Sequence, residues 1–177
     1  MARKTSLREF QQKFAERLRD LSSRKTVASK LGFQVGSDNW LVSLSDVSEV
    51  IPVPNFFQVP QTAEWFRGVS NVRGKLYSTI DFSAFQGGEV ITAGTERRVV
   101  LIHEKIIEGS GFLVSRMLGL RNPETFTADG ERDAAKPWIK ARFRDPNNAA
   151  WLELDLEALS RETRFLEVGL IGTLATA

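Results

Sequence analysis

The sequence contains no cysteine and a single histidine, His103, among its 177 residues. Without cysteine the chain has no disulfide framework, no thiolate metal site and no thiol nucleophile, and this composition fits a reducing compartment. A lone histidine within the apolar run VVLIHE is more typical of a structural side chain than of a general base. Clusters of histidine and carboxylate with metal-ligand spacing are also missing. We therefore expect no catalytic residues, no metal site and no cofactor.

Long apolar segments and nucleotide-binding motifs are missing as well. No run approaches the ~20 apolar residues of a membrane span, and MARKTSLREFQQKF lacks the apolar core of a signal peptide. The GSG at 109–111 is not followed by the Lys-Ser/Thr of a phosphate-binding loop, and there is no Gly-x-Ser-x-Gly. These absences favour a cytoplasmic protein that is not an enzyme and does not insert into a membrane.

Charge is distributed unevenly along the chain. Residues 1–30 carry nine Lys/Arg and three Asp/Glu, a net charge of +6, whereas the remainder carries 15 basic and 19 acidic residues, a net charge of −4. A basic arm thus precedes a mildly acidic body. Such an arm can contact nucleic acid, an anionic membrane surface or an acidic partner, and a solvated helix is the alternative interpretation.

The basic arm also has the apolar periodicity of a helix. One stripe recurs at spacings of three and four residues: Leu7, Phe10, Phe14, Leu18 and Leu21. Ser6, followed three residues later by Glu9, has the form of a capping box. This pattern predicts a helix over about residues 6–22, joined by a polar connector to the rest of the chain.

From residue 31 the period changes to two, which indicates strands. Three turn signals predict hairpins: GSDN between LGFQV and WLVSL, Arg73-Gly74 between GVSNV and KLYSTIDF, and DPNN between PWIKARFR and AWLELDL. SDVSEVIPV predicts one helical turn and then a strand, and RRVVLIH, KIIE and GSGFLV predict further strands. Residues 121–136 are expected to form a polar loop. DLEALSRETRFLEVGL predicts one or two helical pieces.

Many short strands with few helices are typical of a barrel or a sandwich. The β-rich stretches at about 31–88 and 97–155 have similar lengths. They could therefore be two small barrels packed together.

The stretch VSEVIPVPNFFQVPQTAEWFRGVSNVRGKLYSTIDF resembles the central signature of the CheW family, the adaptors of bacterial chemosensory arrays. The positions that fit this signature in order and spacing are Val47, Glu49, Val50, Pro60, Phe66, Gly68, Val69, Asn71, Val72, Arg73, Gly74, Ile80, Asp81 and Phe82. The resemblance extends more faintly over about residues 30–160. It departs from the family at GFLVSR, where Ser115 stands in the place of an aspartate.

The resemblance implies a mainly β fold, in which two SH3-like five-stranded β-barrels pack about a shared apolar core, with helices at both ends. The expected organisation is a basic N-terminal helix and connector at 1–30, a CheW-like domain at 31–160 and a C-terminal helical tail at 161–177. Within the domain, the two β subdomains would be the stretches at about 31–88 and 97–155.

The resemblance also implies a function. Members of this family are non-catalytic adaptors that bind a CheA-type histidine kinase through one barrel and a methyl-accepting chemoreceptor through a groove between the barrels. The N-terminal extension and the wording IPVPNFFQVPQTAEWF look most similar to PilI-type adaptors of systems that control type IV pili and twitching motility. We therefore expect a cytoplasmic adaptor associated with membrane-bound chemoreceptor arrays.

The partner-binding residues expected from the matched segments are Val47, Glu49, Val50, Asn71, Arg73 and Lys75. Gly68 and Gly74 are expected to have structural roles, at a close backbone approach or bulge and in the tight turn respectively. Asn-Val-Arg-Gly can be simply a good hairpin turn, but a turn does not need arginine, so we favour a binding role for Arg73. Glu49 could instead pair with Arg73 within the chain and orient it.

Two other functions remain open from the residues alone. Small β-barrels often bind single-stranded nucleic acid through aromatic and basic side chains, here Phe56, Phe57, Trp65, Phe66 and Tyr77 near Arg67, Arg73 and Lys75. The acidic body argues against that reading, and we expect no nucleic-acid partner. The other alternative is a hydrolase that uses Asp81, Glu49 or His103.

The apolar stripe of residues 6–22 predicts that this segment docks on another surface, because each large apolar side chain gains about 1.5–3 kcal/mol when buried. Deletion of residues 1–22 should leave a cooperative β-sheet unfolding transition, as followed by circular dichroism, while solubility or partner binding is weakened. Loss of the β-sheet signal in the truncated chain would show instead that this segment belongs to the core.

Overall fold

The computed structural model describes residues 29–92, 94–130 and 134–169. The predicted helix at 6–22 and the end of the C-terminal tail lie outside these residues. The strands are β1 (Lys30–Val35), β2 (Asp38–Ser43), β3 (Val47–Pro52), β4 (Phe66–Val72), β5 (Lys75–Asp81), β6 (Arg98–Ile102), β7 (Ser110–Val114), β8 (Arg116–Arg121), β9 (Thr127–Ala128), β10 (Ile139–Arg144) and β11 (Ala150–Leu154). The helical pieces are η1 (Leu44–Asp46), α2 (Phe82–Phe85), η2 (Pro123–Thr125), α3 (Leu156–Ser160) and α4 (Thr163–Leu166).

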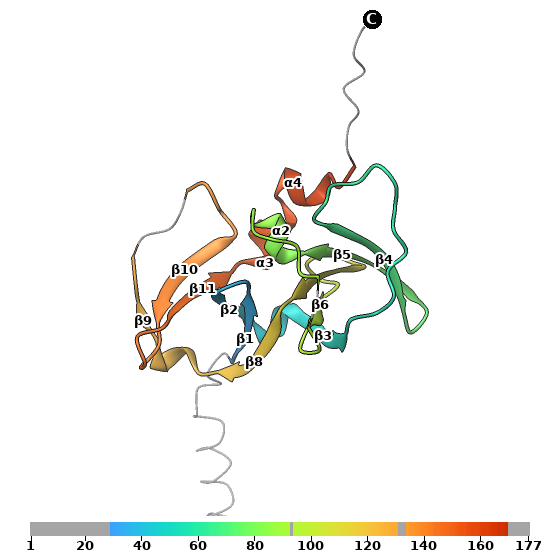
Figure 1. Cartoon of the computed structure of the whole chain (residues 1–177). Helices are drawn as coiled ribbons and strands as arrows, with labels where there is room; N and C mark the ends of the chain where they lie inside the picture. The colour runs from blue at the N-terminus through green and yellow to red at the C-terminus, as the bar shows by residue number, and fades with distance from the viewer. Residues whose placement is uncertain (1–28, 93, 131–133, 170–177) are drawn as a thin grey trace, which may run out of the picture.

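The strands form two sheets that lie side by side, with the short helices α2, α3 and α4 at their junction (Figure 1). A six-stranded sheet has the order β8-β1-β2-β11-β10-β9, and a five-stranded sheet has the order β3-β6-β7-β5-β4. The pairs β2–β11 and β5–β7 are parallel and the others antiparallel. The fold is therefore mainly β with two mixed sheets.

Two features of the expected architecture need correction. The barrels are not closed, because the edge strands of each sheet are not hydrogen-bonded to each other, and one sheet has six strands rather than five. The stretches 31–88 and 97–155 also do not each form one sheet. The six-stranded sheet takes β1 and β2 from the first stretch, and the five-stranded sheet takes β6 and β7 from the second. The parallel pairs β2–β11 and β5–β7 each join a strand of the first stretch to a strand of the second.

The three predicted hairpins are confirmed: β1 pairs with β2, β4 with β5, and β10 with β11. The helical turn and strand predicted from SDVSEVIPV are η1 and β3. The segment KIIE, predicted to be a strand, forms a turn and irregular structure between β6 and β7. The stretch at 121–136, predicted to be a loop, contains η2 and the two-residue strand β9.

The main apolar core lies between the two sheets. Phe33 on β1 is 5.4 Å from Phe112 on β7, measured between ring centroids, and both side chains have no exposed surface. Phe82, at the start of α2, lies 5.1 Å from Trp40 and 5.3 Å from Phe112. Aromatic rings from both sheets and from α2 thus pack in one cluster, and burial of each large ring contributes on the order of 2–3 kcal/mol.

A second apolar cluster lies on the other face of the five-stranded sheet. Its buried members are Ile51, Ile91, Val99, Leu101 and Leu113, with Val53, Phe56, Val72 and Tyr77 packed against them. Side chains from β3 and β4 meet in this cluster although these strands are the two edges of the sheet. The sheet is therefore curled, with both edges turned towards a common interior.

The Asp81 carboxylate is fully buried at the end of β5 and holds three backbone N–H groups. Oδ1 accepts hydrogen bonds from Ser83 and Ala84 at 3.1 Å and so caps α2, and Oδ2 accepts from Ile91 at 2.7 Å. These bonds satisfy the carboxylate and fix both α2 and the segment that follows it. Asp81 therefore has a structural position.

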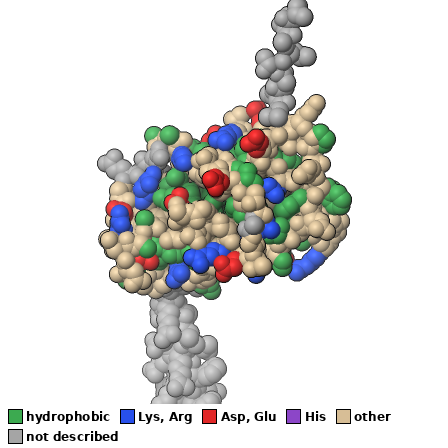
Figure 2. All heavy atoms as spheres, in the orientation of Figure 1, with side chains coloured by type: hydrophobic (Ala, Val, Ile, Leu, Met, Phe, Trp, Pro, Cys, Tyr) green, Lys and Arg blue, Asp and Glu red, His purple; other side chains and the backbone are tan. Residues whose placement is uncertain are grey.

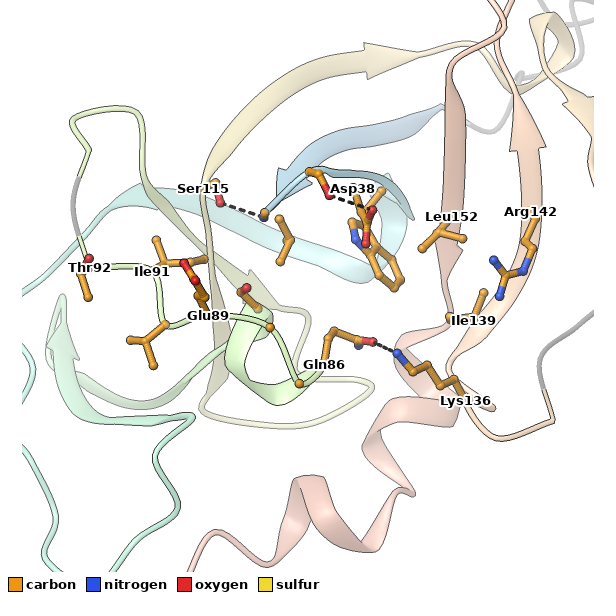
Figure 3. Close-up of a pocket in the computed structure, with 18 residues that line it drawn as sticks. Asp38, Gln86, Glu89, Ile91, Thr92, Ser115, Lys136, Ile139, Arg142 and Leu152 are labelled. Atoms are coloured by element: carbon orange, nitrogen blue, oxygen red, sulfur yellow. Dashed lines mark hydrogen bonds between the residues drawn. The ribbon is translucent and has the colours of Figure 1, made fainter.

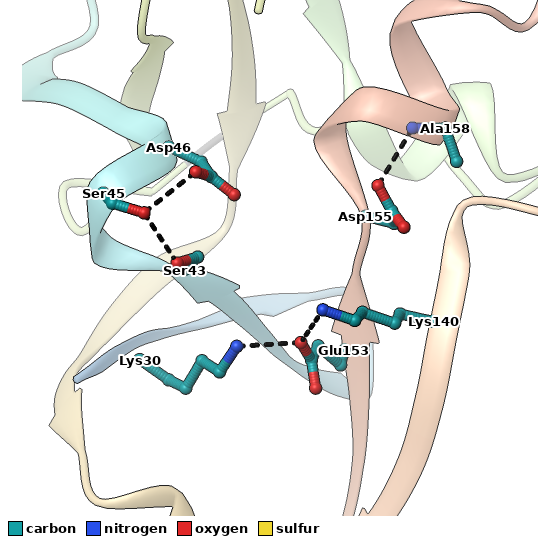
Figure 4. A network of polar contacts seen from close by, with 8 residues as sticks. All are labelled: Lys30, Ser43, Ser45, Asp46, Lys140, Glu153, Asp155 and Ala158. Atoms are coloured by element: carbon teal, nitrogen blue, oxygen red, sulfur yellow. Dashed lines mark hydrogen bonds and ion pairs between the residues drawn. The ribbon is translucent and has the colours of Figure 1, made fainter. Parts of the chain in front are cut away.

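The beginning of β1 is tied to β11 by a nearly buried ion-pair cluster (Figure 4). Glu153 lies between Lys30 Nζ at 2.8 Å and Lys140 Nζ at 3.4 Å, and its side chain is 9% exposed. Two cations beside one carboxylate help to offset the free energy lost when Glu153 leaves water.

The DPNN turn between β10 and β11 is organised by Asp145, whose Oδ1 accepts hydrogen bonds from the N–H groups of Ala149 and Asn147, both at 2.9 Å. The bond from Ala149 is the largest cause of a lowered pKa of Asp145. Trp151 Nε1 donates to the same carboxylate at 3.2 Å. The predicted turn is thus built from side-chain to backbone bonds.

No helix in the described part of the chain is long and apolar enough to cross a membrane.

Gly68 generates a stability prediction because its φ is +110° and a Cβ there would overlap the carbonyl oxygen of Phe57. Gly68→Ala should lower the free energy of unfolding by about 2–4 kcal/mol in urea titrations. Gly36→Ala is the matched control, since Gly36 has a φ of +58° and open space around it. The control should lose only about 1–2 kcal/mol from backbone strain. Equal losses in the two variants would contradict a tight contact at Gly68.

Candidate partner-binding site

The hairpin between β4 and β5 ends in a two-residue turn, Arg73-Gly74, in which both residues have positive φ, 52° and 86° respectively. This is the conformation of a turn whose twist matches the strands that it joins. Asn71 Oδ1 accepts a hydrogen bond from Gly74 N–H at 2.8 Å, which ties the turn to its own backbone. Arg73 takes up a left-handed conformation that disfavours side chains with a Cβ. Local turn chemistry alone would not select arginine there.

Arg73 forms a two-point ion pair with Glu49. Arg73 Nη1 lies 3.0 Å from Glu49 Oε2, and Nη2 lies 2.7 Å from Oε1. The Arg73 side chain is 78% exposed and that of Glu49 34%. The fork geometry fixes the orientation of the guanidinium group, although its exposure to water limits the strength of the pair. The internal pairing that the sequence left open is therefore present.

The ion pair connects parts of the five-stranded sheet that are not hydrogen-bonded neighbours. Glu49 lies on β3, at one edge of the sheet, whereas Arg73 lies at the tip of the β4–β5 hairpin at the other edge. A second link joins the β3–β4 connection to β4, because Phe57 and Val69 exchange two backbone hydrogen bonds of 2.8 and 2.9 Å. Gly68 permits this close approach. The curled sheet thus holds the hairpin tip in a fixed place.

A cleft of about 470 Å³ lies beside the hairpin. Lys75, Leu76 and Tyr77 of β5 line it together with Val47, Ser48, Ile102, His103, Glu104, Glu108 and Gly109. Leu76 is 66% exposed, and Lys75 Nζ lies 3.5 Å from a carboxylate oxygen of Glu104. An exposed aliphatic side chain bordered by paired charges is a surface suited to a protein partner.

The structure brings five of the six expected partner-binding residues to this region. Asn71 and Arg73 lie at the hairpin tip, Glu49 of β3 pairs with Arg73, and Val47 and Lys75 line the cleft. Val47 and Val50 are both half-buried and pack against the main core, but only Val47 also lines the cleft, so Val50 is the one that does not reach this region. A simple alternation of faces along β3 does not predict which of its residues face the core, because the register of β3 against β6 shifts between Val47 and Glu49.

The three residues of the hydrolase alternative occupy separate environments. Asp81 holds backbone N–H groups, Glu49 pairs with Arg73, and His103 Nδ1 accepts a hydrogen bond from Lys105 N–H at 3.2 Å. Within the described residues, none of the three hydrogen-bonds another. No group of three or more His, Cys, Asp or Glu in these residues could hold a metal ion.

Sequence reasoning missed an apolar surface at one end of the six-stranded sheet. Leu120 on β8 pairs in register with Leu31, next to Lys30, and is 62% exposed. Leu44 N–H donates to the Ser29 carbonyl at 3.2 Å, and the Leu44 side chain is 42% exposed. Both leucines therefore lie at the Lys30 end of β1. The sequence did not predict β8, because RMLGLR lacks the alternation of apolar and polar residues that indicates a strand.

Lys/Arg and Asp/Glu side chains are interspersed on the face shown in Figure 2, rather than gathered in a basic stripe. An exposed ion-paired hairpin on such a mixed surface suits contact with another protein. The chain belongs to the CheW family: residues 30–164 match the model of the CheW-like domain. It is thus a non-catalytic scaffold adaptor of CheW type.

Two relatives are similar in sequence. The chain is 29% identical over 144 residues to protein PilI of Pseudomonas aeruginosa, with 79% of each chain covered. It is 24% identical over 131 residues to chemotaxis protein CheV3 of Helicobacter pylori, which covers 71% of this chain and 42% of CheV3. The chain therefore spans less than half the length of CheV3.

The fold is also similar to the crystal structure of the scaffolding protein TtCheW from Thermoanaerobacter tengcongensis, with a TM-score of 0.63 and 15% identity. The similarity covers 73% of this chain and 90% of TtCheW. At 15% identity, this similarity is evidence for a shared fold.

The Glu49–Arg73 pair predicts a small coupling energy. In a double-mutant cycle of Glu49→Ala and Arg73→Ala, unfolding in urea should give a coupling of about 0.3–1 kcal/mol, because Arg73 is largely exposed. Alanine at 73 retains a Cβ in the left-handed conformation, so this substitution reports mainly on the side chain. A coupling above about 2 kcal/mol would instead identify the pair as the principal lock between the sheet edges.

Proposed function

We propose that this protein couples a chemoreceptor to a CheA-type histidine kinase in a chemosensory system that controls type IV pili. The family membership and the likeness to PilI support this proposal. The observation that carries it is the Glu49–Arg73 pair, held in place on the exposed hairpin. The protein would act at the cytoplasmic side of membrane-bound receptor arrays, without inserting into the membrane and without a nucleic-acid partner.

We assign the kinase-binding role to the hairpin tip and the cleft beside it. The two contacts to Glu49 use only part of the five-donor fork of Arg73, so the remaining donors can meet a carboxylate or carbonyl of the partner. Because Glu49 already orders the guanidinium, binding loses less side-chain entropy. Leu76 adds an apolar contact next to these polar groups. A rigid charged group beside an aliphatic contact provides both orientation and affinity.

We assign the receptor-binding role to the apolar end of the six-stranded sheet. Leu44 at the start of η1 and Leu120 on β8 are exposed there. Exposed leucines of this kind suit contact with the apolar face of an amphipathic helix. The two roles are thus supported by different surfaces, as an adaptor requires.

The proposal predicts that Arg73 contributes more to partner binding than to stability. Arg73→Ala should weaken co-sedimentation with receptor and kinase by about 1.5–3 kcal/mol, the value of a lost charge-assisted hydrogen bond. Its effect on unfolding should remain within about 1 kcal/mol. Arg73→Glu should weaken binding further, because repulsion from the acceptor oxygen of the partner is added to the lost bond.

Arg161→Ala is the matched control, since Arg161 is also 78% exposed and pairs with Glu157 at 3.6 Å. It should leave co-sedimentation unchanged. If a tagged full-length chain recovers no histidine kinase from the cytosol of its own cells, the proposed function is wrong. If kinase is recovered equally well by Arg73→Glu, the adaptor role holds and the assignment of the hairpin does not.

A further inference from the structure

A larger cleft, of about 760 Å³, lies at the junction of the sheets and away from both surfaces assigned above (Figure 3). Its walls are the β1–β2 turn, the segment after α2, Ser115 between β7 and β8, and the residues around β10. It borders the Val35 end of β1, whereas Leu44 and Leu120 lie at the Lys30 end. Its volume is that of sites that bind small ligands or peptide side chains.

One part of the cleft lining, called the floor below, is apolar. Trp40 and Ile139 line it and are 2% and 3% exposed, and Leu152 is half-buried beside them. These side chains come from three strands of the six-stranded sheet, β2, β10 and β11. An aliphatic side chain of a ligand would leave water when it lies against this floor, which gives a favourable contribution to binding.

One wall of the cleft presents backbone groups that have no partner. Residues 89–92 form no strand, and among the described residues their backbone makes one hydrogen bond, from Ile91 N–H to Asp81 Oδ2 at 2.7 Å. The N–H groups of Val90 and Thr92 are therefore open. The buried Asp81 carboxylate and the buried Ile91 side chain hold the segment in position. A fixed segment with open N–H and C=O groups can pair with another extended backbone.

The rim of the cleft carries charges of opposite sign on different walls. Lys136 and Arg142 come from the β10 side, while Glu89 lies on the 89–92 wall (Figure 3). Lys136 Nζ lies 3.4 Å from Gln86 Oε1, a long contact with a neutral group. A carboxylate on the ligand would give Lys136 a stronger, charge-assisted bond.

We propose that this cleft binds an extended peptide segment of a partner protein, with an aliphatic side chain on the Trp40–Ile139–Leu152 floor and an acidic side chain near Lys136. Side chains two residues apart face the same way in an extended peptide, so the acidic and aliphatic residues stand at positions i and i+2. The peptide backbone pairs with Val90 and Thr92. This site is a third interaction surface, and it does not depend on the assignments of the hairpin and the leucine surface.

A selection with displayed random nonapeptides on the full chain tests the proposal. Thr92→Trp serves for counter-selection, because Thr92 is an exposed residue of the cleft wall and the larger side chain occupies the cleft. We expect enrichment of peptides in which Asp or Glu stands two residues from Leu, Ile, Val or Met. The most enriched peptide, synthesised and titrated by calorimetry, should bind at least about tenfold more weakly to Lys136→Glu.

Lys105→Glu is the matched control, since Lys105 is half-exposed, pairs with Asp46 and does not line the cleft. It should bind the peptide like the unmodified chain, and thermal melts should show that all variants are folded. On binding, amide exchange at Val90 and Thr92 should slow at least about tenfold. The proposal is overturned if no peptide family is enriched over the counter-selection, or if the enriched peptides bind Lys136→Glu as tightly. Binding without slower exchange at Val90 and Thr92 would overturn the backbone pairing.

Discussion

The aromatic packing between the two sheets is the constraint on which the rest of the structure depends. Phe33 and Trp40 of one sheet meet Phe112 of the other, and Phe82 of α2 lies among them. Since neither sheet closes on itself, each relies on this shared interior to cover one face. The positions of the hairpin, the leucine surface and the large cleft are consequences of how the sheets meet there.

Asp81 shows how one polar group is used within this apolar surrounding. Its strand, β5, begins beside the Arg73–Gly74 turn and ends in the core. At the buried end the carboxylate is stabilised by three backbone N–H donors, which satisfy both of its oxygen atoms. The same strand therefore leads from the exposed hairpin tip at one end to a wall of the cleft, which it fixes, at the other.

The elements that the sequence predicted well are those determined by neighbouring residues. Arg73-Gly74 and DPNN are local turn signals, and the alternating residues around them determine the hairpins. Strand β8 was missed because Gly119, with a φ of 79°, interrupts its alternation and its neighbour Leu120 remains exposed. Its pairing with β1 depends on tertiary contacts that periodicity does not contain. Sheet membership was missed for the same reason, because parallel pairing of β2 with β11 leaves no local signature.

For the candidate site, the sequence predicted which residues to consider but not their arrangement. Arg73 was conspicuous because turn chemistry does not require it, and Glu49 was kept as a possible internal partner. Only the curl of the five-stranded sheet, which brings β3 to the hairpin tip, determines that the two meet. Val50 illustrates the converse, since a register shift in β3 turns it towards the core. The cleft at 89–92 had no sequence signal, because open backbone groups are independent of side-chain type.

The parallel pairing of β2 with β11 also determines how much of the fold can form while the chain is being synthesised. Strand β2 can pair with its second neighbouring strand, through residues 39–42, only after residues 151–154 have been synthesised. Strand β5 likewise pairs with β7 only after β7 has been synthesised. During synthesis the growing chain therefore cannot complete one sheet before the other is begun, and its aromatic residues stay without their final cover until nearly the whole domain has been translated. Such long-range closure slows folding and lengthens the time during which apolar surface is open to chaperones.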